Sequence, residues 1–380
     1  MGSSGAKISR QLFSRRWTPW WSLMSNWPTL PLSEVVALQR GHDLPTASRH
    51  HGDVPVVGSF GITGWHDEAK SRAPGVTIGR SGASIGTAVF VDVDFWPLNT
   101  CLYVTDFKGN DPRWVFHVLD LIDFAAYNSG SAQPSLNRNY LALIPVAVPP
   151  LDEQKRIARV LRALDDLIAT DRHQVERLEE LARAIAAAAS DTVELRELAQ
   201  SLPSKQVKPS GPVEHYSLPA FDAGAVPELI DGQQIQSNKL RLTQTCVLIS
   251  RLNPKWERCW MTYPKANAVA STEFVPVVGT EATTEEVWAV TSTADFWEQM
   301  RSHVTGTTGS HQRVDKTAVH GLMVSDVRTL PVQRRSSTKV AVEGAQAMRT
   351  EIAELIRVRD ELLPLLMSGA VRISEDLAVA

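Results

Sequence analysis

The segment VPPLDEQKRIARVLRALDDLIA (residues 148–169) passes from two prolines directly into a periodic helical pattern. Pro149 and Pro150 hold the residues before them in extended geometry. Asp152 and Glu153 then suit the first turn of a helix, where the helix dipole is positive. Apolar residues follow at alternating spacings of four and three, at Ile157, Leu161, Leu164, Ile168, Val175, Leu178, Ala182 and Ile185. This repeat is typical of a coiled-coil seam, so we predict a long helix over residues 151–190.

A second helix of the same kind is predicted over residues 333–370, which include KVAVEGAQAMRTEIAELIRVRDELLPLLMSG. Pro364 is expected to bend or end this helix, and Gly369 is a natural stop. Each seam carries one charged interruption, Asp171 in the first helix and Arg359 in the second. If the helices pack antiparallel with these two residues opposed, the other seam positions meet apolar partners. We therefore predict that Asp171 and Arg359 pair and set the register; the alternative is that each side chain reaches solvent separately.

The remaining sequence forms two stretches of different character, residues 27–150 and 191–332. Both contain short alternating runs bounded by turn residues, such as GTAVFVDVDF and TCVLISRL, and both contain a short helical pattern. Both open with a short amphipathic segment and close with a Gly-Ser or Gly-Thr turn, a strand and a proline. We predict an α+β protein that arose by duplication, with two globular domains separated by two long antiparallel helices. Residues 1–26 are interpreted as a disordered or non-native extension and 371–380 as a tail.

The composition excludes several classes of protein. No run of about eighteen apolar residues is present, which argues against a membrane span. The three cysteines, Cys101, Cys246 and Cys259, form no C-x-x-C pair, so we expect neither a disulfide framework nor a zinc site, and we expect a cytoplasmic protein. The net charge of −3 does not by itself indicate a nucleic-acid binder, although a local basic face would suffice.

Motifs for catalysis are missing. The sequence has no P-loop, no G-x-S-x-G elbow and no methyltransferase motif, so we predict that the chain is not an enzyme. The glycine-rich segments GRSGASIG (79–86) and GSFGITG (58–64) are interpreted as a hairpin turn and a plain loop. No metal site is predicted, because the histidines are interpreted as solvated loop residues or as phosphate and base contacts; they include His42, His50, His51, His303 and His311.

Three segments, IPVAVPPLDEQKRIARVLRALDDLI (144–168), SGSAQPSLNRNYL (129–141) and ELLPLLMSGAVRI (361–373), resemble the specificity subunit of type I restriction–modification systems. The second strand–helix junction, VRTLPVQRRSSTKVAVEG, lacks the Pro-Leu-x-Glu-Gln box of the first. The resemblance implies that each globular half reads one half of a bipartite DNA target. It implies that the helices set the half-site spacing and dock two methyltransferase subunits. Motor-nuclease subunits can then join this complex. S-adenosylmethionine is then expected in the methyltransferase, with no cofactor in this chain. The other hypothesis is a non-catalytic coiled-coil adaptor for another protein.

Side-chain chemistry selects candidate DNA contacts, because cations and hydroxyls near glycine turns can approach phosphates while Arg, Lys and Asn can read base edges. In the first half the candidates are Arg49, His50, Lys70, Arg72, Arg80, Ser81, Ser84 and Arg138. In the second half they are Lys239, Arg241, Arg251, Asn253, Lys255, Arg258, His311 and Arg313. For each of them, a solvated surface position is the alternative. Trp65, Trp256 and Trp260 are expected in the core.

Overall fold

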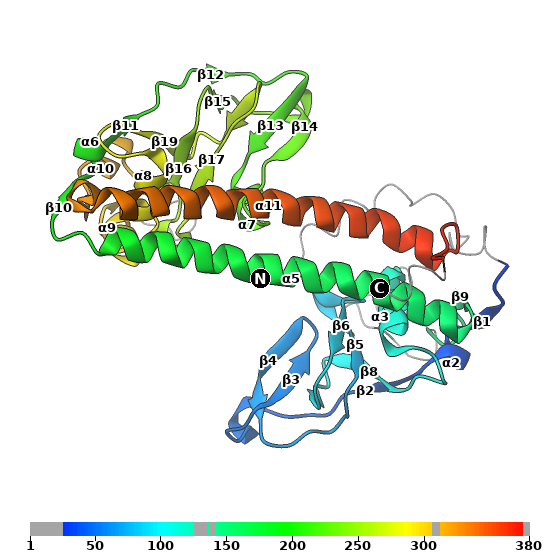
Figure 1. Ribbon diagram of the computed structural model, residues 1–380. Coiled ribbons are helices and arrows are strands. Elements are labelled where there is room, and N and C mark those ends of the chain that lie inside the picture. Colours follow the sequence, from blue (N-terminus) through cyan, green and yellow to red (C-terminus); the bar gives the residue numbers. More distant parts are fainter. Residues whose placement is uncertain (1–25, 125–135, 137–140, 306–311, 375–380) are drawn as a thin grey trace. The chain divides into compact units, whose positions relative to one another are not determined.

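The protein is described by a computed structural model that covers residues 26–124, 136, 141–305 and 312–374 (Figure 1). The chain divides into two compact units. Unit 1 comprises residues 1–166 and 356–380, and unit 2 comprises residues 167–355. Two long helices, α5 (Leu151–Ala187) and α11 (Val332–Met367), contribute residues to both units. The segments predicted as long helices, residues 151–190 and 333–370, overlap these two elements.

Unit 1 is built on two sheets, one of four strands in the order β2-β8-β5-β6 and one of three in the order β4-β3-β7. A separate antiparallel pair joins β1 to β9. The strands are β1 (Thr29–Pro31), β2 (Ala37–Arg40), β3 (Val54–Gly58), β4 (Gly61–His66), β5 (Gly75–Gly79), β6 (Ala88–Val91), β7 (Trp96–Pro97), β8 (Cys101–Asp106) and β9 (Pro145–Ala147). The short helices are α2 (Leu32–Val35) and α3 (Pro112–Leu121).

Unit 2 also contains a four-stranded sheet, in the order β11-β19-β16-β17, beside a five-stranded sheet in the order β12-β15-β18-β13-β14. The strands are β10 (Thr192–Glu194), β11 (Ala199–Ser201), β12 (Gln206–Val207), β13 (Pro212–Tyr216), β14 (Glu228–Asp231), β15 (Lys239–Arg241), β16 (Cys246–Ser250), β17 (Cys259–Thr262), β18 (Ala268–Ala270), β19 (Phe274–Gly279), β20 (Val304–Thr305), β21 (Arg313–Val314) and β22 (Met323–Ser325). The short helices are α6 (Leu195–Leu198), α7 (Leu218–Asp222), α8 (Thr284–Thr291), α9 (Ala294–Ser302) and α10 (Lys316–Val319).

The two units repeat one strand order, as a duplication predicts. In each four-stranded sheet the first strand along the chain pairs with the last, and the two middle strands follow: β2-β8-β5-β6 corresponds to β11-β19-β16-β17. The pair β1–β9 corresponds to β10–β22, and each of these pairs is antiparallel. A short helix follows the last strand of each sheet, α3 in unit 1 and α8 in unit 2. The five-stranded sheet of unit 2 and the β4-β3-β7 sheet of unit 1 differ, so the halves diverge outside this shared framework.

The start of each long helix is tied to the start of the short helix in the same unit, through the fourth residue of the long helix. In unit 1 the buried amide of Gln154 donates to Asn110 Oδ1 at 2.8 Å and to the Pro149 carbonyl at 3.0 Å, and it accepts from the Asp111 amide at 2.9 Å. Asp111 in turn is the N-cap of α3. The Pro-Pro-Leu-Asp-Glu-Gln segment therefore places a bridging amide where strand, short helix and long helix meet.

In unit 2 an ion pair takes the place of that amide. Arg335, the fourth residue of α11, donates from Nε to Glu286 Oε1 at 2.6 Å and from Nη2 to Glu286 Oε2 at 2.9 Å. Glu286 lies in the first turn of α8, where it completes a capping box with Thr283. The second junction lacks the sequence box of the first, yet it makes the equivalent connection with a different pair of side chains.

Within each unit the two long helices contribute to the hydrophobic core. In unit 1, Ile157 and Leu161 near the start of α5 share a buried cluster with Leu366 and Met367 at the end of α11. In unit 2, Ala182 and Ala186 share a cluster with Ala341 and Val342. Pro364 lies inside α11 without ending it, contrary to one of the two expected effects. Gly369, with φ of +71°, follows the last turn in the left-handed conformation that stops a helix.

The predicted partner of Arg359 is wrong. The Arg359 guanidinium lies 3.1 Å from Asp165 Oδ1 and 2.8 Å from Asp360 Oδ1, all three within unit 1. Burial lowers the pKa of Arg359, but its hydrogen bonds to the two carboxylates outweigh that effect and the pKa is raised. Asp165 is the neighbour of the seam residue Leu164, so Arg359 pairs with a residue beside the seam and not with one on it. Asp171 lies in unit 2, buried, and its Oδ2 has no hydrogen-bond partner among the described residues.

Candidate nucleic-acid interface

The β3–β4 hairpin of unit 1 exposes apolar side chains at its surface. Val57 pairs with Ile62 and Val56 pairs with Gly64, so Thr63 is an extra residue in a β-bulge. This bulge brings Ile62 and Trp65 to the same face of the hairpin, where they are 57% and 54% exposed. Phe60, in the turn between the strands, is 69% exposed. The expectation that Trp65 lies in the core is wrong, and the segment expected to be a plain loop forms a turn and strand β4.

The cationic candidates of this part of unit 1 differ in whether another group already engages their charge. Arg49 is held against it, because its Nη1 donates to the Thr63 carbonyl at 3.0 Å and lies over Gly64. Lys70 pairs with Glu68 at 2.5 Å and lies 5.0 Å from the centre of the Trp96 ring. Arg72 is exposed and makes no ion pair with any residue that the structure describes. His50 pairs with Asp67, 3.4 Å away.

The glycine-rich segment 79–86 forms the hairpin connection between β5 and β6, as predicted. Arg80 is half-buried, and its Nη1 donates to the Asn99 carbonyl at 3.2 Å. The Ser84 hydroxyl is buried and donates to the Ser81 carbonyl at 2.9 Å. The prediction that Ser84 contacts DNA therefore does not hold for this conformation, since its hydroxyl stabilises the turn from inside. Ser81 and Arg80 keep partial exposure.

In unit 2, carboxylates engage three of the predicted cations. Arg258 forms a bidentate pair with Asp222, with both hydrogen bonds at 2.7 Å. Arg313 forms a bidentate pair with Glu273 at 2.9 and 3.0 Å, and Arg251 lies 3.5 Å from the same carboxylate. The hydrogen bonds from Arg313 lower the pKa of Glu273. These three arginines therefore make structural ion pairs, which the sequence alone does not distinguish from free surface charge.

The other cations of unit 2 lie on β15 and on the short turn Pro254–Trp256. Lys239 donates to Ser237 Oγ at 2.6 Å, while Arg241 and Lys255 are exposed and form no ion pair within the described ranges. The Lys255 ammonium lies 5.1 Å from the centre of the Trp256 ring, which is 43% exposed. The expected burial holds for Trp260, but Trp256 is at the surface. Asn253, with φ of +49°, begins this turn in the left-handed conformation.

Two candidates, Arg138 and His311, lie outside the described residues. The exposed aromatic side chains are the part of the site that sequence reasoning missed. Phe60, Trp65 and Trp256 each sit next to a glycine or a left-handed turn residue, which is the signal that could have indicated exposure. Aromatic faces beside cations are suited to stack on nucleobases and to contact phosphates.

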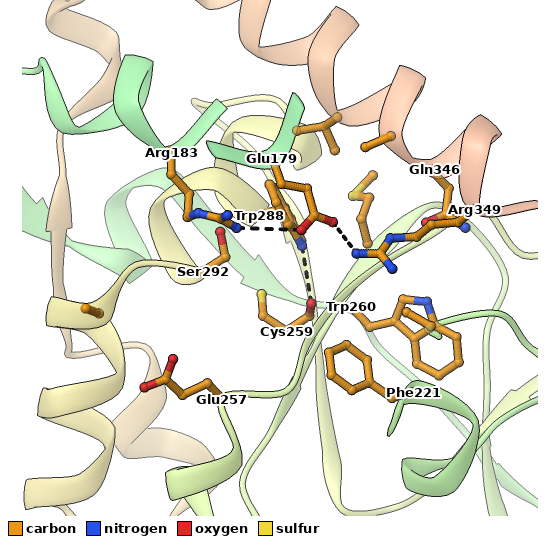
Figure 2. A pocket seen from close by; sticks show the side chains of 15 residues that line it. Glu179, Arg183, Phe221, Glu257, Cys259, Trp260, Trp288, Ser292, Gln346 and Arg349 are labelled. Atoms are coloured by element: carbon orange, nitrogen blue, oxygen red, sulfur yellow. Dashed lines mark hydrogen bonds and ion pairs between the residues drawn. The ribbon is translucent and has the colours of Figure 1, made fainter. Parts of the chain in front are cut away.

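A cavity of about 420 Å³ opens inside unit 2 between the long helices and the four-stranded sheet (Figure 2). Its charged side chains are paired with one another. Figure 2 shows Glu179 between two arginines, with Arg349 at 2.6 Å and Arg183 at 3.7 Å. Glu257, at the rim, pairs with Arg301 at 2.8 Å. The Glu179–Arg349 pair joins α5 to α11, and the pairing leaves little free charge for a ligand.

The cysteine thiols do not supply a nucleophile. All three are buried, and burial raises the pKa of Cys101 and Cys259 to about 12 and that of Cys246 to about 11. A thiol in this state stays protonated at neutral pH and is inert. No helix in the described part of the chain combines the length and apolarity needed to cross a bilayer.

Comparisons with known proteins connect this geometry to one family. Residues 24–180 match the family model described as the type I restriction modification DNA specificity domain. The chain is 28% identical over 141 residues to the type I restriction enzyme EcoprrI specificity subunit of Escherichia coli, an alignment that covers 36% of this chain and 35% of that protein. It is 26% identical over 123 residues to the type I restriction enzyme MjaVIII specificity subunit of Methanocaldococcus jannaschii, covering 32% of this chain and 25% of that protein.

These alignments span about a third of the length of the curated relatives or less. The structural similarity covers more of the chain than these sequence alignments do. The crystal structure of a type I restriction–modification S subunit from M. genitalium matches 92% of this chain and 99% of its own, with a TM-score of 0.61 and 14% identity. The likeness at this identity concerns the fold alone.

Proposed function

We propose that the chain, whose residues 24–180 match the type I restriction modification DNA specificity domain, is the DNA-reading, non-catalytic subunit of a type I restriction–modification complex. The observation that carries the proposal is the repeated strand order of the two units, each of which also exposes cations and aromatic side chains. Two similar units on one chain suit a target with two half-sites, and their divergence suits two different half-sites.

In this proposal unit 1 reads one half of the target with the β3–β4 hairpin and Arg72, and unit 2 reads the other half with Arg241, Lys255 and Trp256. The two long helices act as an antiparallel coiled-coil spacer and dock two methyltransferase subunits, to which motor-nuclease subunits can be added. The partner methyltransferase binds the methyl donor S-adenosylmethionine and carries out the chemistry. The purified chain alone is then expected to transfer no methyl group to DNA, and to direct sequence-specific methylation once its partner is added.

A salt titration tests DNA binding by the exposed cations. Each phosphate contact contributes about −0.9 to the slope of log affinity against log salt concentration. We expect a steep negative slope with random-sequence duplex DNA for the complex with its methyltransferase. Replacing Arg72, Arg241 and Lys255 by alanine should flatten the slope by about 0.9 for each phosphate that the variant no longer neutralises. Lys339→Ala, on the exposed face of α11, is the matched control for removal of one charge. An unchanged slope in the triple variant would contradict the assignment.

An exchange of segments tests the division of labour. Residues 27–147 are replaced by the corresponding segment of another family member, and the methylated target of the reconstituted complex is sequenced. We expect one half of the target to change and the other half to remain. A change in both halves, or in neither, would contradict modular reading and would favour the adaptor hypothesis if DNA binding were also absent.

A further inference from the structure

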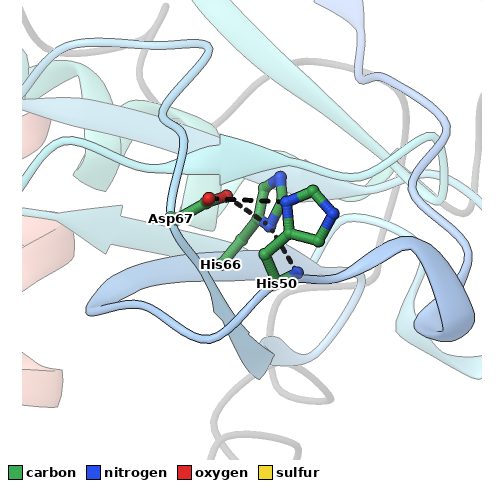
Figure 3. Close-up of side chains that lie close together, drawn as sticks. All are labelled: His50, His66 and Asp67. Carbon is green, nitrogen blue, oxygen red and sulfur yellow. Dashed lines mark hydrogen bonds and ion pairs between the residues drawn. The ribbon is translucent and has the colours of Figure 1, made fainter.

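One cluster of potential metal ligands lies beside the β3–β4 hairpin and is independent of the DNA proposal. His66 is the last residue of β4, Asp67 follows it, and His50 comes from the segment that leads into β3 (Figure 3). His50 Nδ1 lies 3.4 Å from Asp67 Oδ2, and His66 Nδ1 lies 3.1 Å from Asp67 Oδ1. One ligand atom from each residue falls within 4.8 Å of the others.

The hydrogen bonding around His66 leaves two acceptors facing each other. Its Nδ1 accepts from the His50 backbone amide at 3.1 Å, so in that arrangement the nitrogen carries a lone pair and no proton. The same nitrogen lies 3.1 Å from an oxygen of Asp67, which is also an acceptor when ionised. A cation bound to both atoms removes this repulsion. Because Nδ1 has a single lone pair, the ion would replace the His50 amide as its partner.

The separations also fit a metal. Zinc binds imidazole nitrogen and carboxylate oxygen at about 2.0–2.1 Å in tetrahedral sites, which puts neighbouring ligand atoms about 3.3 Å apart. His66 Nδ1 lies 3.1 Å from Asp67 Oδ1 and His50 Nδ1 lies 3.4 Å from Asp67 Oδ2, both close to that value, and the candidate ligand atoms of the three residues lie within 4.8 Å of one another. Imidazole and carboxylate together favour zinc or cobalt over magnesium and calcium.

One residue of the cluster is buried and the other two are exposed. His66 is 4% exposed, and its ring packs edge-on against Trp96 with centroids 5.2 Å apart, which fixes its orientation. His50 and Asp67 are exposed, so an ion could enter from solvent and keep a water molecule as fourth ligand. We propose that His50, His66 and Asp67 form a zinc-binding site, which reverses the interpretation of His50 as a metal-free loop residue.

A metal here would compensate for a thin local core. The β4-β3-β7 sheet is covered by two small clusters, one of Val56, Trp96 and Leu98 and the other of Val57, Val91 and Phe95. The site joins residue 50 to residues 66 and 67, and thereby closes the loop that contains the whole β3–β4 hairpin. A bound ion would hold the base of that hairpin and stabilise the conformation that presents its exposed turn.

Metal titration of the full chain, purified without a polyhistidine tag, tests the site. With Zn²⁺ alone as probe in calorimetry, we expect saturable binding of one ion per chain and a higher Tm. With Co²⁺ we expect the strong absorption in the visible range that is typical of tetrahedral coordination. His50→Gln and Asp67→Asn should each weaken binding at least tenfold, because even partners outside the ligand shell cost 10–100-fold. Both replaced side chains are exposed, so these variants should fold.

His51→Gln is the matched control, since His51 is exposed next to His50 and lies outside the cluster. It should retain wild-type affinity and the rise in Tm with Zn²⁺. Absence of saturable Zn²⁺ binding would overturn the proposal and indicate that a proton on His66 Nδ1 occupies the position between nitrogen and carboxylate. Equal weakening by His50→Gln and His51→Gln would also overturn it, because it would indicate scattered binding to surface histidines.

Discussion

Replacing Arg335 by methionine should destabilise unit 2 far more than removal of a surface charge. The Glu286 carboxylate is 1% exposed and accepts both hydrogen bonds from Arg335. Methionine keeps most of the volume of the arginine stem but removes the positive charge. The Thr283 amide, at 2.7 Å, then continues to donate to the carboxylate. Removing one partner of a buried ion pair costs about 3–5 kcal/mol, because the remaining charge stays out of water.

One feature of the site limits this cost. The Thr283 amide continues to stabilise the carboxylate through the capping box. We therefore expect a decrease of about 3 kcal/mol in the free energy of unfolding at pH 7.

Urea denaturation followed by circular dichroism measures this decrease. Arg177→Met is the matched control, because Arg177 in the same unit forms an exposed pair with Glu180 at 3.0 Å and should cost less than about 0.5 kcal/mol. Adding Glu286→Gln to Arg335→Met should restore about 2 kcal/mol, because glutamine carries no charge and can still serve the capping box. A decrease below about 1 kcal/mol in Arg335→Met, or no restoration by Glu286→Gln, would refute the reasoning.

Three further predictions concern unit 1. Gln154→Leu should lower the free energy of unfolding by about 1–3 kcal/mol, because the Asp111 amide and Asn110 Oδ1 lose their buried partner. Urea denaturation measures this decrease, and an unchanged free energy of unfolding would contradict the anchoring role of Gln154. Burial, with the charges of Arg113 and Arg359, lowers the pKa of His117 to about 3, so the unfolded chain binds the proton first and stability falls as the pH drops from about 6.5 toward 3. Between pH 7.5 and pH 5 this decrease is about 2 kcal/mol, and His117→Phe should remove it while the exposed-site variant His173→Gln should keep the wild-type slope. Trp65→Ala should weaken DNA binding by the reconstituted complex about tenfold, as expected for about 1–3 kcal/mol of aromatic stacking, with circular dichroism unchanged; wild-type affinity would remove Trp65 from the interface.

The long helices could be predicted because their signal is local. The repeat from Ile157 to Ile185 and the two prolines before it lie within one continuous segment, and α5 spans Leu151–Ala187. The duplication was also visible, because each half shows the same succession of short amphipathic segment, turn, strand and proline. The partner of Arg359 could not be predicted from the sequence. An arginine side chain can reach Asp165, which lies beside the seam, as readily as it can reach a seam residue.

The candidate DNA contacts were harder to predict, since they depend on which side chains meet in three dimensions. Arg313 pairs with Glu273, 40 residues away, and Arg258 pairs with Asp222, 36 residues away, so no local pattern shows that these cations are neutralised. Trp65 reaches the surface through the bulge at Thr63, and Trp256 through a turn that begins with left-handed Asn253.

The division of the chain into units has a consequence for the order in which they fold. Unit 2 is one continuous segment, residues 167–355, whereas unit 1 needs residues 356–380 in addition to the first 166. Leu366 and Met367 belong to the same buried cluster as Leu161, so this core is incomplete until the ribosome has made the end of α11. Closing so long a loop is entropically slow. We expect unit 2 to fold first during synthesis, while the earlier-made segment of unit 1 waits with an open core and depends most on chaperones.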